Sequence, residues 1–146
     1  MLKFLETSNK NQFISNYPMP FKGQHVIWIQ ENVRVLIVLD DVVSALSNLD
    51  ANVDFWFLDG FSPSKNERMW DERVFKKIRM LSRPGGRALT YSSAGKVKLN
   101  LENNGFKTKK ERGFGKKKEM LTGYLDGKWL PAELIDKDFT IVGSGL

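Results

Sequence analysis

The strongest constraint on the fold is the alternation of β-rich runs with helical segments from residue 33 onward. A compact apolar run at residues 54–58, DFWFL, ends at Asp59-Gly60 and reads as a strand buried on both faces. In the helix expected next, at residues 69–82, apolar residues recur at helical spacing: Trp70, Val74, Ile78 and Leu81. This alternation predicts an α/β fold with a mostly parallel sheet and an antiparallel pair at its C-terminal end.

The other expected elements follow from local patterns of turn and β-forming residues. Before the run at 54–58 we expect a helix at 2–15, a hairpin of strands 25–30 and 34–39 around Glu31-Asn32, and a helix from Asp40 or Asp41 to Leu49. After the helix at 69–82, which Pro84-Gly85-Gly86 stops, we expect a strand at 87–91 and a helix at 94–104 that ends at Gly105. Two further strands are expected at 106–111 and 119–125. A polar linker, 126–138, precedes a last strand that enters a glycine turn at 139–146.

Composition narrows the class of protein. The chain has 146 residues, which suits one domain, and a formal net charge of +6, which favours a polyanionic partner. It has no Cys and a single His, His25, so thiolate and His-based metal sites are not expected. The N-terminus is polar by position 6, and no apolar run approaches the ~20 residues of a membrane span. We expect a cytoplasmic protein without a metal or a membrane partner.

Asp59 is the sharpest candidate for chemistry. In an open parallel sheet, ligands bind beyond the carboxyl ends of the strands, and Asp59 lies at such an end. Gly60 permits a tight turn there, and Pro63 stiffens the loop. A carboxylate in this place can accept a hydrogen bond from an amine or take its proton. The alternative is that Asp59 only caps a turn. Asp40 and Asp41 pose the same choice at another strand end, between a nucleoside contact and a helix cap.

A basic segment at residues 107–118 is the candidate RNA-binding site. Gly113 and Gly115 flank Phe114, which places an aromatic ring at the tip of a flexible loop, and Glu111 is the one acid. Cations follow phosphates and an aromatic ring stacks on a base. The alternative is a solvated charged hairpin. The basic residues of the segment are Lys107, Lys109, Lys110, Arg112, Lys116, Lys117 and Lys118.

The terminal segment, IVGSGL, gives a weaker signal. A strand that runs into Gly-x-Gly begins a dinucleotide-binding βαβ unit, and here Gly143 and Gly145 supply two of its glycines. The alternative is a frayed tail.

Four stretches together resemble one known family. They are NYPMPFKGQH at residues 16–25, FWFLDGFSPSKNERMW at 55–70, LSRPGGRALTYSSAG at 81–95 and NNGFKTKKERGFGKKKEML at 103–121. Each is similar to a block of the methyltransferase domain of the MnmC family, and they occur in the family's order. The terminal FTIVGSGL resembles the first strand and glycine turn of the FAD-binding domain that follows in this family.

The resemblance implies a function. Members of this family are bifunctional: a class I methyltransferase uses S-adenosylmethionine to methylate the 5-aminomethyl group of 2-thiouridine at the tRNA wobble position, and an FAD-dependent oxidase acts one step earlier. Asp59 falls on the family's functional aspartate, which orients the substrate amine. Asp41 matches an acidic residue near the adenine of the cofactor. The remaining cofactor contacts implied are Gly60, Phe61 and Pro63, with Gly143 and Gly145 for FAD.

The resemblance also implies an incomplete class I (Rossmann-like) S-adenosylmethionine methyltransferase sheet, in which the last strand inserts between the two strands before it. Residues 1–125 would be the C-terminal portion of that domain, 126–138 a linker and 139–146 the start of the FAD domain. The family's glycine-rich turn and two central strands would lie upstream. We therefore expect a fragment, inactive alone, whose partners are tRNA and the N-terminal half of its own domain. The alternatives are a non-enzymatic basic RNA-binding module and a class I methyltransferase with another substrate.

Overall fold

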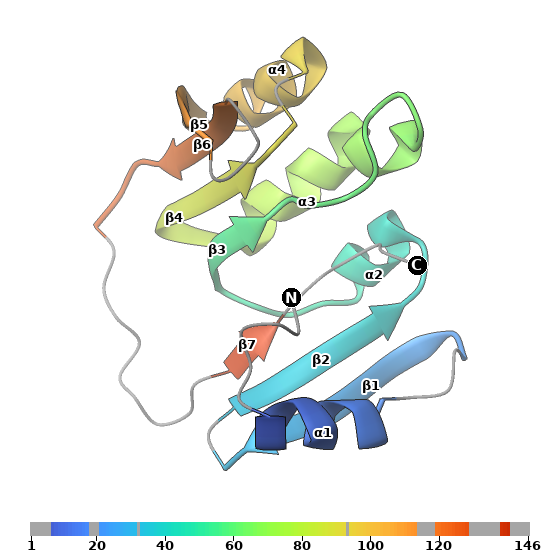
Figure 1. The fold of residues 1–146 in the computed structure, drawn as a ribbon. Helices are drawn as coiled ribbons and strands as arrows, with labels where there is room; N and C mark the ends of the chain where they lie inside the picture. The colour runs from blue at the N-terminus through green and yellow to red at the C-terminus, as the bar shows by residue number, and fades with distance from the viewer. Residues whose placement is uncertain are drawn as a thin grey trace. The chain divides into compact units, whose positions relative to one another are not determined.

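A computed structural model describes residues 7–17, 21–31, 33–92, 94–113, 119–128 and 138–140, with only the backbone of residues 7–9, 12 and 138–140. The described residues divide into two compact units (Figure 1). The N-terminal unit comprises the described residues up to Asp41 together with 138–140, and the C-terminal unit runs from Val42 to Lys128. None of the described helices is long and apolar enough to cross a membrane.

The N-terminal unit is a small sheet with one helix. It contains helix α1 (Thr7–Ser15) and strands β1 (Gly23–Gln30), β2 (Val33–Leu39) and β7 (Asp138–Thr140), in the sheet order β1-β2-β7. β1 and β2 form the expected antiparallel hairpin, and β7 pairs parallel with β2. Its core packs the partly buried Phe13, Val33 and Ile37 around three buried side chains: Ile27, Ile29 and Val35.

The C-terminal unit is a four-stranded sheet with helices. In chain order its elements are α2 (Val42–Ser47), β3 (Val53–Phe57), the 3-10 helix η2 (Glu67–Trp70), α3 (Glu72–Leu81), β4 (Ser82–Thr90), α4 (Gly95–Asn103), β5 (Phe106–Arg112) and β6 (Glu119–Leu125). The strand order is β3-β4-β6-β5, so the last strand inserts between the two before it, as the resemblance implied. Figure 1 shows the four strands side by side with α3 and α4 packed along them.

The α/β class and the order of elements from residue 33 onward are confirmed. The antiparallel C-terminal pair is also confirmed, since β5 and β6 pair antiparallel over their whole length. Parallel pairing is less extensive than expected, because among the described strands only β3 with β4 and β2 with β7 are parallel. β6 enters the sheet antiparallel to β4, which leaves a single parallel pair in this sheet.

Two boundaries differ from expectation. The helix expected at 69–82 is two elements, because the backbone of Asp71 is extended (φ −68°, ψ 148°) and separates η2 from α3. The strand expected at 87–91 begins at Ser82 and ends at Thr90. Ser82 already pairs with Val53, and an irregularity follows before the pairing resumes at Arg87. Pro84-Gly85-Gly86 therefore bends a strand that has begun, and Gly85 takes the positive φ (79°) that this bend needs.

The helices bury one face of the sheet. The indole Nε1 of Trp56 donates to Ser82 Oγ at 2.8 Å, and that hydroxyl donates to the carbonyl of Ile78 at 2.5 Å. This chain of bonds joins β3 to α3 inside the core. The largest fully buried side chains come from both helices and from β6: Phe75, Ile78, Val97, Leu101 and Leu121.

Candidate active-site edge

Asp59 follows β3 at its carboxyl end, and its side chain is exposed. The backbone N–H of Leu58 donates to the carbonyl of Leu89 at 2.8 Å, so the contact with β4 continues to the residue before Asp59. The N–H of Asp59 then donates back to the carbonyl of Phe57 at 3.0 Å. This turn ends the strand and places Asp59 at the edge where ligands bind in open α/β sheets.

The loop after Asp59 is anchored from within the core. The indole Nε1 of Trp70 donates to the backbone carbonyl of Phe61 at 2.8 Å, and Trp70 is itself only 3% exposed. The N–H groups of Lys65 and Asn66 both donate to the carbonyl of Ser62 and close the loop. A buried side chain thus fixes the backbone two residues beyond Asp59, while Asp59 itself stays exposed to solvent.

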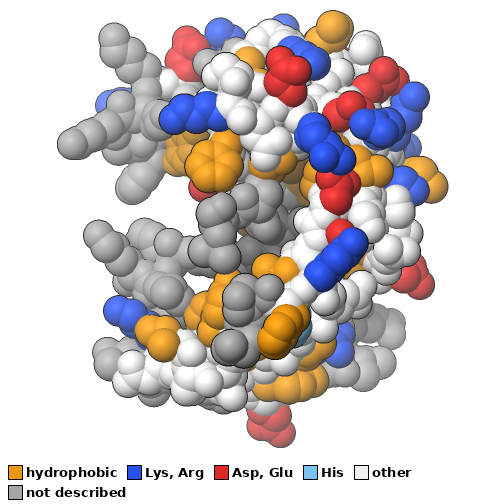
Figure 2. Space-filling view, turned by 90° about the vertical axis from the view of Figure 1, so that its right-hand side faces the viewer, with side chains coloured by type: hydrophobic (Ala, Val, Ile, Leu, Met, Phe, Trp, Pro, Cys, Tyr) orange, Lys and Arg blue, Asp and Glu red, His pale blue; other side chains and the backbone are white. Residues whose placement is uncertain are grey.

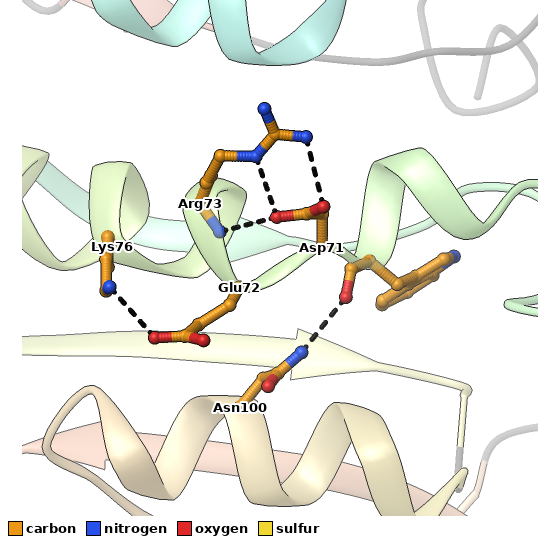
Figure 3. A network of polar contacts seen from close by, with 6 residues as sticks. Asp71, Glu72, Arg73, Lys76 and Asn100 are labelled. Carbon is orange, nitrogen blue, oxygen red and sulfur yellow. Dashed lines mark hydrogen bonds and ion pairs between the residues drawn. The ribbon is translucent and has the colours of Figure 1, made fainter.

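Trp70 is held in turn by a polar network (Figure 3). Asn100 on α4 is buried, and its Nδ2 donates to the carbonyl of Trp70 at 3.0 Å. Trp70 also packs against Phe75, with ring centroids 6.4 Å apart. Sequence reasoning placed Trp70 in an apolar helical stripe and passed over Asn100, because periodicity does not show which polar side chain will reach a buried carbonyl.

Asp71 caps α3, and hydrogen bonds to its carboxylate shift its pKa. Its Oδ1 accepts from the backbone N–H of Arg73 at 2.9 Å, and the Arg73 guanidinium donates to both carboxylate oxygens (Figure 3). Hydrogen bonds from the Arg73 side chain and backbone lower the pKa of Asp71 from 3.8 to about 2. Lys76 and Glu72 form an ion pair one turn further on, at 2.9 Å.

The neighbouring strand brings further side chains to the same edge. Since β3 and β4 are parallel, with Phe57 opposite Leu89, the residues after β4 lie beside those after β3. Thr90 is buried and its Oγ1 accepts from the N–H of Ser92 at 3.0 Å, whereas Tyr91 is exposed. Sequence reasoning assigned no role to Tyr91, although TYSS belongs to one of the stretches that carry the resemblance.

Three of the other expected cofactor contacts lie on the loop that carries Asp59. Gly60, Phe61 and Pro63 share the loop with Asp59, and Phe61 is exposed while Gly60 and Pro63 are half-buried. Asp41 is exposed at the end of β2 in the N-terminal unit, where its N–H donates to Asp40 Oδ1 at 2.7 Å. Asp40 forms an ion pair with Lys22 at 2.9 Å. Gly143 and Gly145 lie outside the described residues.

In the basic hairpin formed by β5 and β6, nearby acids pair with some of the lysines. Lys107 pairs with Asp126 at 2.7 Å, and the hydrogen bond that its Nζ donates to the Asp126 carboxylate raises the pKa of Lys107. Within the described part of the hairpin, Lys109 also pairs with Glu111 at 3.3 Å and Lys110 with Glu119 at 3.2 Å. Of the residues expected to bind RNA, Lys109, Lys110 and Arg112 lie on β5, and Phe114, Lys116, Lys117 and Lys118 lie outside the described residues.

The carboxyl ends of β3 and β4 point toward the face that Figure 2 presents. Over the upper part of that face, Lys and Arg side chains alternate with Asp and Glu side chains, and hydrophobic side chains are exposed among them (Figure 2). No group of three or more His, Asp or Glu side chains in the described parts of the chain is arranged to hold a metal ion. The edge offers carboxylate and aromatic groups, which suit an amine, a cation or a planar base.

Comparison with known proteins shows the family to which the chain is similar. Residues 5–126 match a family described as S-adenosyl-L-methionine-dependent methyltransferase. Three relatives each bear the name tRNA 5-methylaminomethyl-2-thiouridine biosynthesis bifunctional protein MnmC. They are 43% identical over 112 residues in Chromohalobacter salexigens, 40% over 121 residues in a Psychrobacter species and 40% over 121 residues in a Marinomonas species.

These matches cover 77%, 77% and 82% of this chain, but only 16%, 16% and 18% of the respective relatives. The chain therefore spans about a sixth of their length. A crystal structure of MNMC2 from Aquifex aeolicus shares the fold, with a TM-score of 0.66 at 24% identity over 85% of this chain and 38% of that one.

Proposed function

Since the chain belongs to the S-adenosyl-L-methionine-dependent methyltransferase family, we propose that its β3–β4 edge takes part in methyl transfer to an amine on the tRNA wobble uridine. The acceptor is the 5-aminomethyl group of a 2-thiouridine. The observation that carries this proposal is the place of Asp59, an exposed carboxylate directly after a parallel strand, on a loop whose backbone Trp70 holds. The names of the three relatives support tRNA as the substrate.

The role proposed for Asp59 is to orient the acceptor amine. Its carboxylate accepts a hydrogen bond from the amine N–H, which directs the nitrogen lone pair toward the methyl donor, and it can take the proton that the amine releases. Such a transfer depends on alignment of the reacting atoms, and a fixed loop supplies that alignment. The bond from Trp70 to the carbonyl of Phe61 therefore matters for rate as well as for stability.

The residues at this edge fit the cofactor that the family uses. When bound, S-adenosylmethionine supplies an electrophilic methyl group on a cationic sulfonium. The exposed rings of Phe61 and Tyr91 and the carboxylate of Asp59 suit a cation and a planar base. We propose Gly60, Phe61 and Pro63 as the cofactor contacts at this edge. Asp41, which the resemblance implies as a further cofactor contact, stays a prediction.

The proposed FAD site begins after β7. This strand ends at Thr140, and the Gly143-x-Gly145 turn would follow it. A strand that leads into such a turn is how an FAD-binding unit starts, and the word bifunctional in the names of the relatives agrees with a second activity.

A chimera tests the proposal. The matched segment of the Chromohalobacter salexigens relative is replaced by this chain, and methyl transfer is followed from methyl-labelled S-adenosylmethionine. The expected acceptor is tRNA carrying 5-aminomethyl-2-thiouridine, with the same tRNA lacking the aminomethyl group as control. Transfer to the modified tRNA alone supports the proposal, and a folded chimera that labels neither tRNA contradicts it. This chain on its own is assayed beside the chimera, and we predict no transfer by it.

A further inference from the structure

We propose that Asn100, on helix α4, is a positioning residue that fixes the loop carrying Asp59, and that it acts through Trp70. Asn100 works from within the core, where it is 7% exposed. Its effect on the loop rests on hydrogen bonds that the chain makes within itself. Its effect on methyl transfer rests in addition on the proposed function.

The break between η2 and α3 turns the usual helical donors away from the carbonyl of Trp70. In a continuous helix, the backbone N–H groups three and four residues later would reach that carbonyl. Here Asp71 takes both, because the N–H of Arg73 donates to its Oδ1 at 2.9 Å and the N–H of Val74 to its carbonyl at 3.0 Å. The Nδ2 of Asn100 donates to the Trp70 carbonyl at 3.0 Å instead (Figure 3). Since a buried carbonyl without a donor is costly, this bond holds the junction.

Helix α4 gives Asn100 a fixed base. Val97 and Leu101 lie three residues before it and one after it, on the same face of the helix, and both are fully buried. The Nδ2 of Asn104 donates to the backbone carbonyl of Asn100 at 2.8 Å, near the end of the helix. The amide of Asn100 therefore reaches Trp70 from a packed surface, which leaves it little freedom to follow a displaced partner.

Trp70 connects this bond to the loop. Its carbonyl accepts from Asn100 and its indole Nε1 donates to the carbonyl of Phe61 at 2.8 Å, so the residue is held at both ends. Phe61 lies two residues beyond Asp59. When the bond from Asn100 is lost, the backbone at Trp70 can shift and the loop can shift with it. Every contact in this series is made within residues 59–104 of the chain.

Hydrogen exchange of the whole chain tests the effect on the loop. The reporters are the amides of Lys65 and Asn66, which both donate to the carbonyl of Ser62 and close the loop. Asn100→Leu fills the space of the side chain without its donor, and it should speed the exchange of both amides about tenfold. Asn100→Asp keeps the shape and also removes the amide donor, so it serves where the leucine variant does not fold. Unchanged exchange in a folded variant would overturn the proposal.

Ser82→Ala is the matched control for a loss of stability. It also removes a buried hydrogen bond of the core, but Ser82 pairs with Val53 at the start of β3, at the opposite end of the strand from Asp59. It should leave the exchange of the two loop amides unchanged. Equal acceleration in Asn100→Leu and Ser82→Ala would mean that any destabilisation loosens the loop, and it would remove the particular role of Asn100.

A double-mutant cycle tests whether Asn100 acts through Trp70. Trp70→Phe removes the indole N–H that donates to Phe61, so the connection to the loop is already broken in that variant. Adding Asn100→Leu should then speed the exchange of the loop amides no further. Accelerations that multiply in the double variant would contradict the connection through Trp70.

The chimera described above tests the consequence for methyl transfer, at a temperature where the variants are folded. Asn100→Leu should lower kcat about tenfold and leave KM for tRNA nearly unchanged, since a displaced loop misaligns the acceptor amine and removes no contact with the tRNA. Ser82→Ala should leave kcat unchanged. A wild-type kcat in Asn100→Leu would contradict the proposal.

Failure of the proposed function gives a different result, because the chimera without any substitution would then label neither tRNA. The exchange measurements on Asn100→Leu need no activity, so they still decide whether Asn100 fixes the loop.

Discussion

The indole nitrogen of Trp70 donates to the backbone carbonyl of Phe61 at 2.8 Å, so a buried side chain holds the loop that carries Asp59. This bond connects the stability of the core to the placement of the candidate functional carboxylate. Neither residue needs to contact a substrate for the bond to matter, since a loop displaced by one ångström can cost a large part of the rate.

Replacing Trp70 with Phe should therefore loosen the loop. The change removes the indole N–H that donates to the Phe61 carbonyl, and it removes part of a buried ring. It should therefore lower the free energy of unfolding by about 1 kcal/mol or more. Hydrogen exchange at residues 61–66 should become faster. Trp28→Phe is the control, because Trp28 is 49% exposed, and it should leave both measurements nearly unchanged. Unchanged exchange in Trp70→Phe would show that the bond does not hold the loop.

Asp71 should make stability depend on pH in acid. Its pKa is lowered from 3.8 in the unfolded chain to about 2 in the fold, so its contribution is complete above pH 3.8 and is lost as the pH falls to about 2. Asp71→Asn should remove that part of the pH dependence. Urea unfolding midpoints measured between about pH 5 and 2 check this. Arg73→Gln should flatten the curve in the same way, and a curve unchanged in both variants would contradict the assignment.

Ser82→Ala should destabilise the core by about 1–3 kcal/mol, because it leaves the buried Trp56 Nε1 without an acceptor. Chemical denaturation measures the loss. Ser64→Ala is the matched control, since the Ser64 hydroxyl bonds to that of Ser62 on an exposed loop, and it should change stability by less than about 0.5 kcal/mol. Similar losses of stability in the two variants would mean that the buried hydrogen bonds of Ser82 contribute no more than an exposed one.

Two glycines should respond oppositely to alanine. Gly127 has a φ of +134°, and a Cβ built there would lie 2.5 Å from the Cβ of Pro84, so Gly127→Ala should cost about 1 kcal/mol or more. Gly95 begins α4, and a Cβ there would meet nothing within 4 Å, so Gly95→Ala should be neutral or slightly stabilising. Thermal melting of the two variants compares them directly, and a stable Gly127→Ala would show that the turn can shift.

Much of the fold could be predicted because local pattern and tertiary packing agree along this chain. The run at residues 54–58 forms β3 (Val53–Phe57), but the expectation that both its faces are buried was wrong, because Phe55 and Phe57 are exposed. Gly105, with a φ of +86°, follows α4 where the sequence indicated a helix stop. The insertion of β6 between β4 and β5 came from the resemblance, because strand order depends on contacts between residues distant in the sequence.

The rest depends on contacts that no local pattern contains. Helical spacing at Trp70 looks the same whether or not Asp71 interrupts the helix, and only the cap bond to Arg73 decides it. Ser82 begins β4 because Val53 is opposite it, and Val53 lies on another strand. In the candidate site, the position of Asp59 at a strand end was predictable. The hydrogen bonds of Trp70 and Asn100 that hold the loop, and the position of Tyr91 at the same edge, were not.

The role of Asp59 is tested most directly by comparing two aspartates at opposite ends of β3 in the chimera described above. Asp59→Asn should lower kcat/KM for methyl transfer to the aminomethyl-bearing tRNA by about a hundredfold or more, with the melting temperature little changed. Asp50→Asn alters an exposed carboxylate before the same strand and should leave kcat/KM unchanged. Wild-type turnover by Asp59→Asn, or an equal loss in both variants, would contradict the proposal that Asp59 orients the acceptor amine.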